Sequence, residues 1–492
     1  MAETKHDSVP DASRPHRGIS LIGLIALVIS SAIGSGVFAL SSDIATAAAP
    51  GPALIAWLVT GIGFMGLATT LGRLSIVAPD IDGVVGYARA GFGRFVGFVS
   101  GWGYWLSIWI GNVAFGVMLV SAIGYFVPTL SGQLEVPGLV LISCVNWLMV
   151  LLVNRGVEEA SFLNAIVMVC KLVPICSFIV AMLFVFSFDV FTVDFWGTLS
   201  ANMAADPDAG SAPSQIVSCL MVMMWTFVGM EGASVLGHRA ERKSDVCRAT
   251  ILGCTVLVVI YVAASILPYG YLPREELAQI GTPSMPYIFE RVVGPWGGTF
   301  ISAGLIVSVL GAWLSFTILA AEAMCGMAQM RLLPRRFARL NTYSAPTACL
   351  FTTGLMIQAL AILMLFSQEA YRFAYSLCTA SITISWILAA AYMVKLGLSR
   401  TERAAMGITP VDIGLALFTV AFLTIAVLVA GVELLMLCCI AYVPGIVFYL
   451  MASKEQDERA LSPIERLIAA AIAVIAIVAI VLVIKDPSLI SG

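Results

Sequence analysis

The chain has 492 residues, of which 60% are hydrophobic and only 11% are charged. Soluble proteins carry about 25% charged residues, so most of this chain must face lipid or other apolar helices. The formal net charge of −3 decides little, because the placement of charge matters more than its sum in a membrane protein. This composition excludes a soluble globular protein and predicts an all-α integral membrane protein.

The histidines and cysteines do not form the patterns of a metal or redox site. The three histidines (His6, His16 and His238) lie outside the apolar runs. The eleven cysteines include no CxxC pair, and most lie inside apolar runs, where they are expected to be small core residues. No nucleophile–base pair is apparent either. We therefore expect no metal, no cofactor and no enzymatic activity.

Thirteen apolar segments are long enough to cross a bilayer, which takes about 20 residues. In chain order they are 19–41, 51–73, 95–127, 137–154, 160–187, 214–237, 249–270, 296–326, 346–367, 371–396, 411–430, 433–451 and 464–484. The third, fifth, eighth and tenth are long enough to tilt or to extend past the bilayer. The polar residues 1–17 are expected to form a disordered cytoplasmic tail.

Basic residues are distributed unequally between the two sides that this map defines. With the N-terminus inside, all but five of the 26 Lys and Arg residues fall in inner segments. The five exceptions are Arg274, Arg291, Arg372 and Lys485 in outer segments, and Lys171 within the fifth span. Since Lys and Arg accumulate in cytoplasmic loops, the N-terminus is expected in the cytoplasm and the protein in the inner (cytoplasmic) membrane.

The first span contains Gly34-Ser35-Gly36 at its middle, within SSAIGSGVF. Glycines favour a break in the helix, and freed backbone groups at bilayer depth are tolerated only beside a cavity. The second half-helix would offer N–H groups to a carboxylate, and the carbonyl end of the first, around Ile33, would face an ammonium group. Such a break would recognise both ends of an amino acid backbone. The alternative is a packing face of small residues.

The sixth span has a corresponding interruption, MWTFVGMEGASVLG, in which Gly229 and Gly232 bracket Glu231. Gly-interrupted segments five spans apart are typical of inverted-repeat transporters, whose site lies at the midplane. An unpaired, ionised Glu231 would cost several kcal/mol there, so it should be protonated, paired or functional. A hydrogen-bonded structural carboxyl is the alternative.

This pairing of interruptions predicts two repeats of five spans. Repeat 1 would occupy residues 18–187 and repeat 2 residues 214–400, with 188–213 as an external loop. Residues 401–492 would add spans 11–13.

Lys171 lies about eleven residues into the fifth span, too deep for its side chain to reach the surface easily. It is expected either to exchange a proton during transport or to replace a bound cation at the helix-1 break.

Aromatic side chains and one amide mark the other helices of the predicted site. An aromatic face can hold a cation, although most aromatics in membrane proteins serve packing. Asn112 is the better candidate for a polar contact. Glu322 on the eighth span is a second-rank residue, either another buried acid or one that approaches the inner surface. The aromatic candidates are Tyr104, Trp105, Trp109, Trp225, Phe227, Trp313 and Phe316.

These segments together resemble the amino acid–polyamine–organocation superfamily, and within it the basic amino acid antiporters. IGSGVF and WTFVGMEGAS look like the two unwound elements of that family. Further similar segments are YARAGFGRFVGFVSGWGYWLSIWIGNVAF, NRGVEEASFLNAIVMVCKLVPI, GAWLSFTILAAE and LLPRRFARLN. The resemblance covers roughly residues 18 to 400. It implies a LeuT-like 5+5 inverted repeat with helices 1 and 6 broken and about 13 spans in all.

The resemblance implies specific roles at the substrate backbone. Ser35 and Gly36 would bind the carboxylate through N–H groups, and the carbonyls of Ile33 and Trp225 would bind the ammonium group. Trp225 would also act as a gate. Glu231 matches an acid implicated in proton sensing, and Lys171 matches a lysine that replaces sodium in proton-coupled relatives.

Two differences from the arginine exchangers concern the substrate side chain. Phe316 stands where a guanidinium-stacking tryptophan is found, and Trp313 lies one turn earlier, so either ring is a candidate. Ser31 replaces an asparagine, whereas Asn112 matches one that contacts the side chain. The expected substrate-binding set is Ser31, Ile33, Gly34, Ser35, Gly36, Tyr104, Asn112, Trp225, Val228, Trp313, Phe316 and Ser381, the last with Thr379 as a guess on helix 10.

The resemblance implies an exchanger of basic amino acids, arginine for ornithine, that operates by alternating access. A proton-coupled permease for lysine or another amino acid is an alternative, as is an amino acid/amine exchanger such as histidine for histamine. A non-transporting amino acid sensor is the alternative from another class. The expected partners are the amino acid, the lipid bilayer and, as an option, a second copy in a homodimer, with no nucleic acid.

Overall fold

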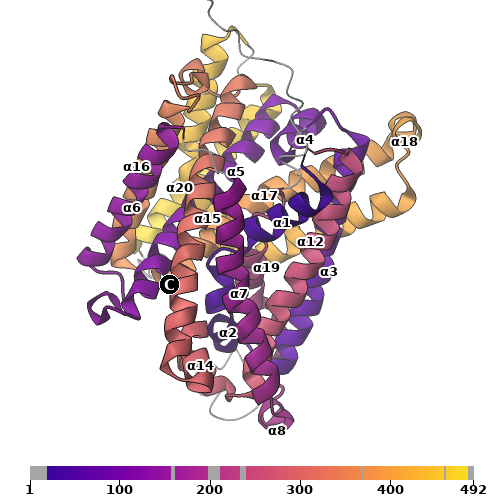
Figure 1. Cartoon of the computed structure of the whole chain (residues 1–492). Helices are drawn as coiled ribbons and strands as arrows, with labels where there is room; N and C mark the ends of the chain where they lie inside the picture. Colours follow the sequence, from indigo (N-terminus) through magenta and orange to yellow (C-terminus); the bar gives the residue numbers. More distant parts are fainter. Residues whose placement is uncertain are drawn as a thin grey trace, which may run out of the picture.

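The computed structural model describes residues 19–81, 83–156, 161–197, 211–232, 240–367, 369–458 and 461–485. These ranges are almost entirely helical (Figure 1), and they contain no strand, only an isolated bridge between Ile19 and Ala240. The all-α fold class is confirmed. The helices are α1 (Leu21–Ala32), α2 (Gly36–Ala47), α3 (Pro50–Val77), α4 (Gly83–Phe92), α5 (Arg94–Gly124), η1 (Pro128–Leu130), α6 (Val136–Asn154), α7 (Ser161–Val185), α8 (Phe188–Thr192), α10 (Ala212–Thr226), α12 (Lys243–Ile266), η4 (Leu267–Gly270), α13 (Arg274–Gln279), α14 (Ser284–Val293), α15 (Pro295–Gln329), η5 (Arg335–Ala338), α16 (Thr347–Leu363), η6 (Met364–Phe366), α17 (Ala370–Leu398), α18 (Arg400–Met406), α19 (Pro410–Glu455) and α20 (Pro463–Lys485).

Within the described residues, eleven helical segments are long and apolar enough to cross a membrane. A twelfth span consists of α1 and α2, which meet at an angle of 51°, and α10 is a shorter apolar helix. Each of the thirteen predicted spans therefore overlaps one of these elements. Two of them are the halves of α19, Pro410–Val429 and Gly431–Glu455, which are separate spans joined at a kink where Gly431 leaves the helical conformation.

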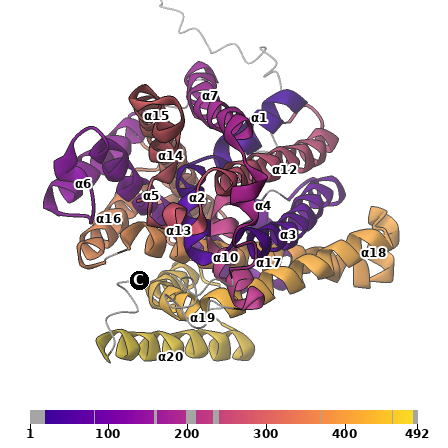
Figure 2. The ribbon, with the colours of Figure 1, turned by 90° about the horizontal axis from the view of Figure 1, so that it is seen from below.

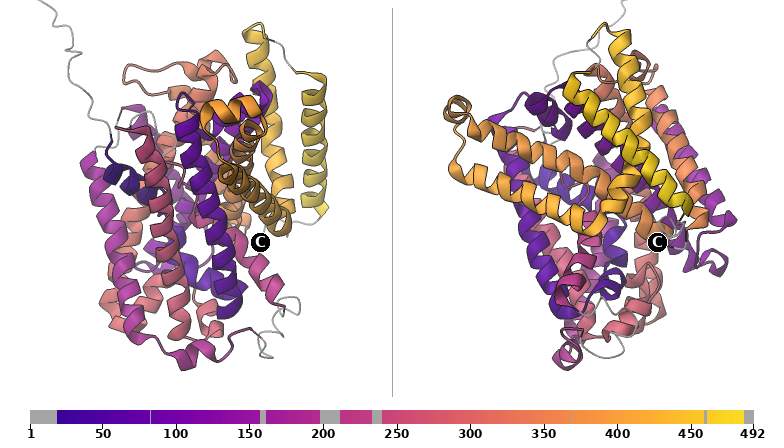
Figure 3. Two further views of the ribbon diagram at one scale, coloured as in Figure 1. Left: turned by 90° about the vertical axis from the view of Figure 1, so that its right-hand side faces the viewer. Right: turned by 180° about the vertical axis from the view of Figure 1, so that it is seen from behind.

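The second half of the broken first span, α2, lies inside the bundle, whereas α1 lies nearer its edge, where Ile22 is exposed. Viewed from one end, α2 and α10 are enclosed by α3, α5, α12, α14 and α17 (Figure 2). The third span, α5, packs against both α15 and α17, and α3 packs against α12. In contrast, α20 packs against α19 at the periphery of the molecule (Figure 3). The buried centre therefore consists of the helices that carry the predicted site.

Small residues allow these helices to approach one another closely. A Cβ atom on Gly72 of α3 would lie 2.9 Å from the Cα of Cys247 on α12. A Cβ atom on Gly63, also on α3, would lie 2.3 Å from the ring of Phe422 on α19. Close backbone contact through small residues is the usual way in which membrane helices gain van der Waals packing.

An ion pair at the start of α19 joins this helix to α3. Arg73 Nε lies 2.9 Å from Asp412 Oδ1, and its Nη2 lies 3.1 Å from Oδ2. Asp412 also completes a capping box with Thr409, whose backbone N–H and hydroxyl both donate to Asp412 Oδ2. One carboxylate thus caps a helix and fastens it to its neighbour.

We expect Asp412→Ala to lower the melting temperature of the purified protein by several degrees. The substitution removes charge-assisted hydrogen bonds, each worth about 1.5–3 kcal/mol, and the helix cap. The measurement is thermal unfolding in detergent, with the exposed Asp80→Ala as the control. Equal melting temperatures for the two variants would contradict this role.

Candidate functional site

The first span is broken where the sequence predicted. α1 ends at Ala32 and α2 begins at Gly36, with Ile33 in an extended conformation between them (φ −76°, ψ 92°). The Gly34 N–H donates to the Ala32 carbonyl (3.0 Å), and the Phe38 N–H donates to the Ser35 carbonyl (3.1 Å). The N–H groups of Gly36 and Val37, the first two residues of α2, precede the point at which bonding within the helix begins. This end of α2 is therefore suited to an anion.

The sixth span is interrupted as well. α10 ends at Thr226, and the chain then turns through residues 227–231. Gly229 has φ +103°, a backbone conformation that L side chains rarely adopt, and its N–H donates to Glu231 Oε2 (3.3 Å). The remainder of the predicted span, from residue 233, lies outside the described residues.

The two interruptions touch each other. A Cβ atom on Gly229 would lie 2.5 Å from the carbonyl oxygen of Ser31, and one on Gly232 would lie 3.1 Å from the Ser31 hydroxyl. On the other side of the break, a Cβ atom on Gly36 would lie 3.0 Å from Trp225 Nε1. Glycine is therefore required at the contact between the two broken helices.

A cavity of about 10 Å³ lies between these interruptions. Its volume holds no more than about one water molecule, so the helices are closed around it. Seven of the predicted substrate-binding residues line it. The lining residues are Ser31, Ala32, Gly34, Ser35, Gly36, Phe115, Trp225, Thr226, Val228 and Phe316.

Phe316, and not Trp313, forms the aromatic wall of this cavity. Its ring lies 5.0 Å from that of Phe115, which in turn lies 5.9 Å from that of Trp225. Trp313 packs against Gly116 of α5 instead, since a Cβ atom on Gly116 would lie 3.0 Å from the Trp313 ring. Of the two candidates for stacking on a substrate cation, the structure places Phe316 at the cavity.

Asn112 is fully buried on α5, one turn before Phe115 and Gly116. Among the described residues, neither its amide nitrogen nor its amide oxygen has a hydrogen-bond partner. The neighbouring Gly111 lies against the Phe316 ring, since a Cβ atom on Gly111 would lie 3.1 Å from Cε2 of that ring. A buried polar group without a partner costs about 1–3 kcal/mol. Asn112 therefore has a hydrogen-bonding capacity that the fold does not use.

Lys171 is buried and reaches the carbonyl end of α1. Its Nζ donates to the carbonyl oxygen of Ser30 at 3.0 Å. The last carbonyls of a helix lack intrahelical partners and carry a partial negative charge. Lys171 thus brings its amino group to the helix-1 break, the place at which one of the two predicted roles has it replace a bound cation.

Ser308 is a contact that the sequence analysis missed. Its hydroxyl donates to the carbonyl oxygen of Gly34 at 3.1 Å. It shares one face of α15 with Ala312 and Phe316, because these residues follow at intervals of four. The periodicity was visible in the sequence, but a serine in an apolar helix does not by itself indicate which backbone carbonyl it bonds.

Tyr371 was also missed, and it closes one side of the cavity. Its hydroxyl lies 3.2 Å from the Ser35 hydroxyl and accepts a hydrogen bond from Trp225 Nε1 at 3.3 Å. Tyr375, one turn later on α17, stacks on Trp225 with ring centroids 6.1 Å apart. The predicted gate residue Trp225 is thus held in a layer with Ser35 and two tyrosines.

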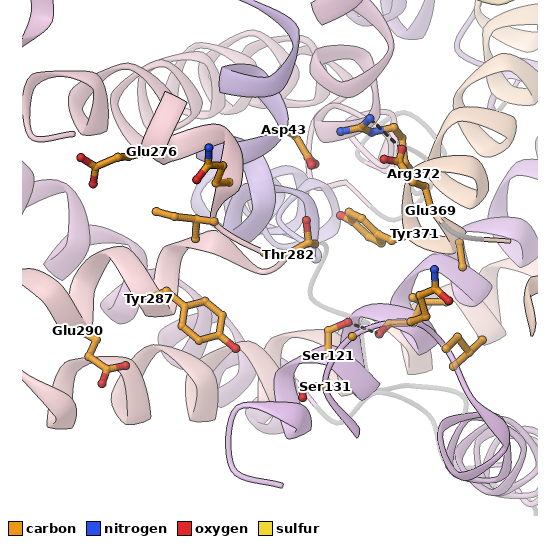
Figure 4. A pocket seen from close by; sticks show the side chains of 18 of the residues that line it. Asp43, Ser121, Ser131, Glu276, Thr282, Tyr287, Glu290, Glu369, Tyr371 and Arg372 are labelled. Atoms are coloured by element: carbon orange, nitrogen blue, oxygen red, sulfur yellow. Dashed lines mark hydrogen bonds and ion pairs between the residues drawn. The ribbon is translucent and has the colours of Figure 1, made fainter. Parts of the chain in front are cut away.

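Beyond this layer opens a vestibule of about 930 Å³ (Figure 4). It lies at the end of the molecule where α2 ends and where α13 and α14 are found. Since Tyr371 lines the vestibule and also bonds Ser35 and Trp225, it separates the vestibule from the small cavity. The polar lining residues are Asp43, Ser121, Ser131, Gln133, Glu276, Gln279, Thr282, Tyr287, Glu290, Arg291, Glu369, Tyr371 and Arg372.

The other five predicted residues do not line the small cavity, and two of them, Ser381 and Tyr104, lie away from the broken helices. The Ser381 hydroxyl donates to the Leu377 carbonyl (2.8 Å) and contacts Cys438 Sγ (3.1 Å), at the interface of α17 and α19. Tyr104 is buried on α5, within electrostatic range of Glu231 and Glu322. The structure brings neither side chain to the broken helices.

We expect Gly229→Ala to disrupt the contact between the two broken helices and to lower the melting temperature of the protein. The added methyl group would meet the Ser31 carbonyl at 2.5 Å, in a backbone conformation that alanine disfavours. Gly326→Ala is the matched control, since a Cβ atom on Gly326 of α15 would have no neighbour within 4 Å. Thermal unfolding in detergent and the amount of monodisperse protein are the measurements. A melting temperature of Gly229→Ala equal to that of Gly326→Ala would refute the helix contact.

Comparison with known proteins identifies the family. Residues 19–434 match the amino acid permease family. The chain is 48% identical over 462 residues to an arginine/ornithine antiporter of Latilactobacillus sakei, which covers 94% of this chain and 96% of that protein. It is 36% identical over 464 residues to an arginine/ornithine antiporter of Pseudomonas aeruginosa, with 93% and 95% covered. An arginine/agmatine antiporter of Chlamydia felis is 34% identical over 453 residues, with 91% and 92% covered.

These matches agree with the apolar helices and with the two contacting interruptions described above. They confirm the resemblance that was noted from the motifs of the third, fifth, sixth and eighth spans. The chain belongs to the amino acid permease family and is a multi-pass membrane protein.

Proposed function

We propose that this protein is an antiporter that exchanges basic amino acids, arginine for ornithine, by alternating access. The names of its relatives support this substrate pair. The observation that carries the proposal is the closed cavity at the contact of two broken helices, with the N-terminus of α2 on one side and Phe316 on the other. That all named relatives are antiporters also supports a non-enzymatic role.

In this proposal the N–H groups at the start of α2 bind the substrate carboxylate. The carbonyl end of α1, around Ile33, binds the ammonium group together with the Trp225 carbonyl, which at present accepts the Val228 N–H at 3.1 Å. The basic side chain extends past Phe316 toward the unpartnered amide of Asn112. A cavity of about 10 Å³ cannot hold an amino acid, so Trp225 and Phe316 must move apart when substrate enters.

Lys171 supports exchange without a coupling metal ion. It is bonded to Ser30 at the end of α1, and it therefore supplies a positive charge that is part of the chain itself. Glu231, which accepts the Gly229 N–H, is proposed to couple its own protonation to the conformation of the helix-6 turn.

The unequal distribution of basic residues supports a cytoplasmic N-terminus and an inner-membrane location. In this orientation the vestibule faces the outside of the cell, and the Tyr371 layer is the outer gate. We further propose that residues 18–187 and 214–400 are the two inverted repeats. Their rocking would then open the cavity alternately to each side.

Counterflow in proteoliposomes tests the exchange. Labelled external arginine is expected to enter only when ornithine or arginine is present inside. An imposed membrane potential should not change the rate, because one monocation replaces another. Exchange for agmatine, a dication, would depend on the potential. Uptake into vesicles without internal amino acid, driven by a pH gradient, would contradict exchange and favour a proton-coupled permease.

Asn112→Leu tests the side-chain contact. We expect the KM for arginine to rise about 10-fold or more, the loss expected for a hydrogen bond to a charged group. Thermal stability without substrate should stay equal or rise, because two buried, unpartnered polar atoms are removed.

Asn146→Leu on α6 is the matched control for this substitution. The amide of Asn146 is also buried, but it donates to the Gly354 carbonyl at 3.1 Å. This variant is expected to lose stability and to keep the KM for arginine. The reverse pattern would exclude Asn112 from the substrate site.

A further inference from the structure

One carboxylate of the vestibule, that of Asp43, has a charged neighbour in Arg372 but forms no direct ion pair with it. Asp43 lies on α2 and lines the vestibule, although only 7% of it is exposed. No hydrogen bond or ion pair of its carboxylate is found within the described part of the chain. An ionised group in such a position within a membrane protein is expensive unless it is paired, and it usually marks a path for substrate or ions.

The other charges of the vestibule already have partners. Glu276 lies 3.3 Å from Arg291, and Glu369 lies 2.8 Å from Arg372. Glu290 accepts a hydrogen bond from the Tyr125 hydroxyl at 2.9 Å. The four carboxylates therefore outnumber the two guanidinium groups, both of which are paired.

This excess gives the vestibule a negative potential, which attracts cations. Asp43 and Tyr371 point into the same space, while Arg372 is engaged with Glu369 (Figure 4). Arg372 also attracts Asp43 electrostatically. An incoming cation therefore competes with this guanidinium for Asp43, but it breaks no direct ion pair of the carboxylate.

Asp43 is also close to the gate along the chain and in space. It follows Gly36 by seven residues on the same helix, a rise of about 10 Å. Tyr371 lies between Asp43 and the small cavity, since it lines the vestibule with Asp43 and its hydroxyl contacts that of Ser35 at the cavity. A molecule held at Asp43 is thus directly in front of the Tyr371 layer.

We propose that Asp43 is a first binding point for the cationic side chain of a basic amino acid that enters the vestibule. The carboxylate pairs with the guanidinium or ammonium group and holds the molecule until the Tyr371 layer opens. This inference rests on the proposed function and adds selection by charge before the substrate reaches the broken helices. A neutral amino acid has no side-chain cation for Asp43 to bind.

Asp43→Asn in the full-length protein tests this site. In oriented proteoliposomes with saturating internal ornithine, the KM for external arginine is expected to rise about 10-fold or more, as for a lost charge-assisted hydrogen bond. The KM measured from the opposite face of the membrane, where Asp43 is not exposed, should be unchanged. Asp43→Glu keeps the charge and should restore most of the external affinity, which separates binding from a folding defect.

Glu276→Gln is the charge-matched control, because it removes one negative charge from the same vestibule at an exposed ion pair. Exposed pairs contribute little, so its external KM should change less than about twofold. Three results would overturn the Asp43 site while leaving the proposed exchange intact. The external KM could rise equally in Glu276→Gln, it could stay unaltered in Asp43→Asn, or the KM of Asp43→Asn could rise equally from both faces of the membrane. Wild-type protein that exchanges no arginine would instead overturn the proposed function, and this inference with it.

Discussion

The structure depends on how the backbone groups freed by two helix breaks are satisfied inside a bilayer. No water is available there, so each free carbonyl or N–H needs a partner from the protein or from a ligand. The Lys171 ammonium bonds the Ser30 carbonyl, and the Ser308 hydroxyl bonds the Gly34 carbonyl. The N–H groups at the start of α2 are left to the cavity. The Ser30 and Gly34 carbonyls are thus stabilised by the chain, whereas the Ile33 carbonyl and the first N–H groups of α2 are left for the substrate in the proposed binding mode.

Most of the fold was predictable from the sequence, because apolar length and glycine position determine it directly. The spans follow from the need for about 20 apolar residues, and the first break was located to the residue. The boundary between the eleventh and twelfth spans was also placed correctly, since α19 kinks at Gly431, between the predicted segments 411–430 and 433–451.

The site was predictable to the extent that its residues are unusual in their sequence context. Gly34, Lys171 and Glu231 stand out from an apolar helix, and a choice between Phe316 and Trp313 could be stated but not made. Ser308, Tyr371 and Asp43 could not be found this way. Serine and tyrosine are ordinary in membrane helices, and Asp43 lies at the end of its span, where an acid is unremarkable. Their importance comes from contacts between distant segments, as in the bond from Tyr371 to Ser35, which are 336 residues apart.

The position of Lys171 has a consequence for the energetics of a carrier built in this way. A bound sodium ion is exchanged with both solutions in every cycle and therefore transfers the energy of its gradient to the cargo. The ammonium group of Lys171 is covalently tethered, and bonded to Ser30 it stays with the protein. As long as it keeps its proton, it can contribute affinity but no driving force. The concentration gradient of the counter-substrate is then the only driving force. Such a carrier can build a gradient of one amino acid no steeper than the opposing gradient of the other.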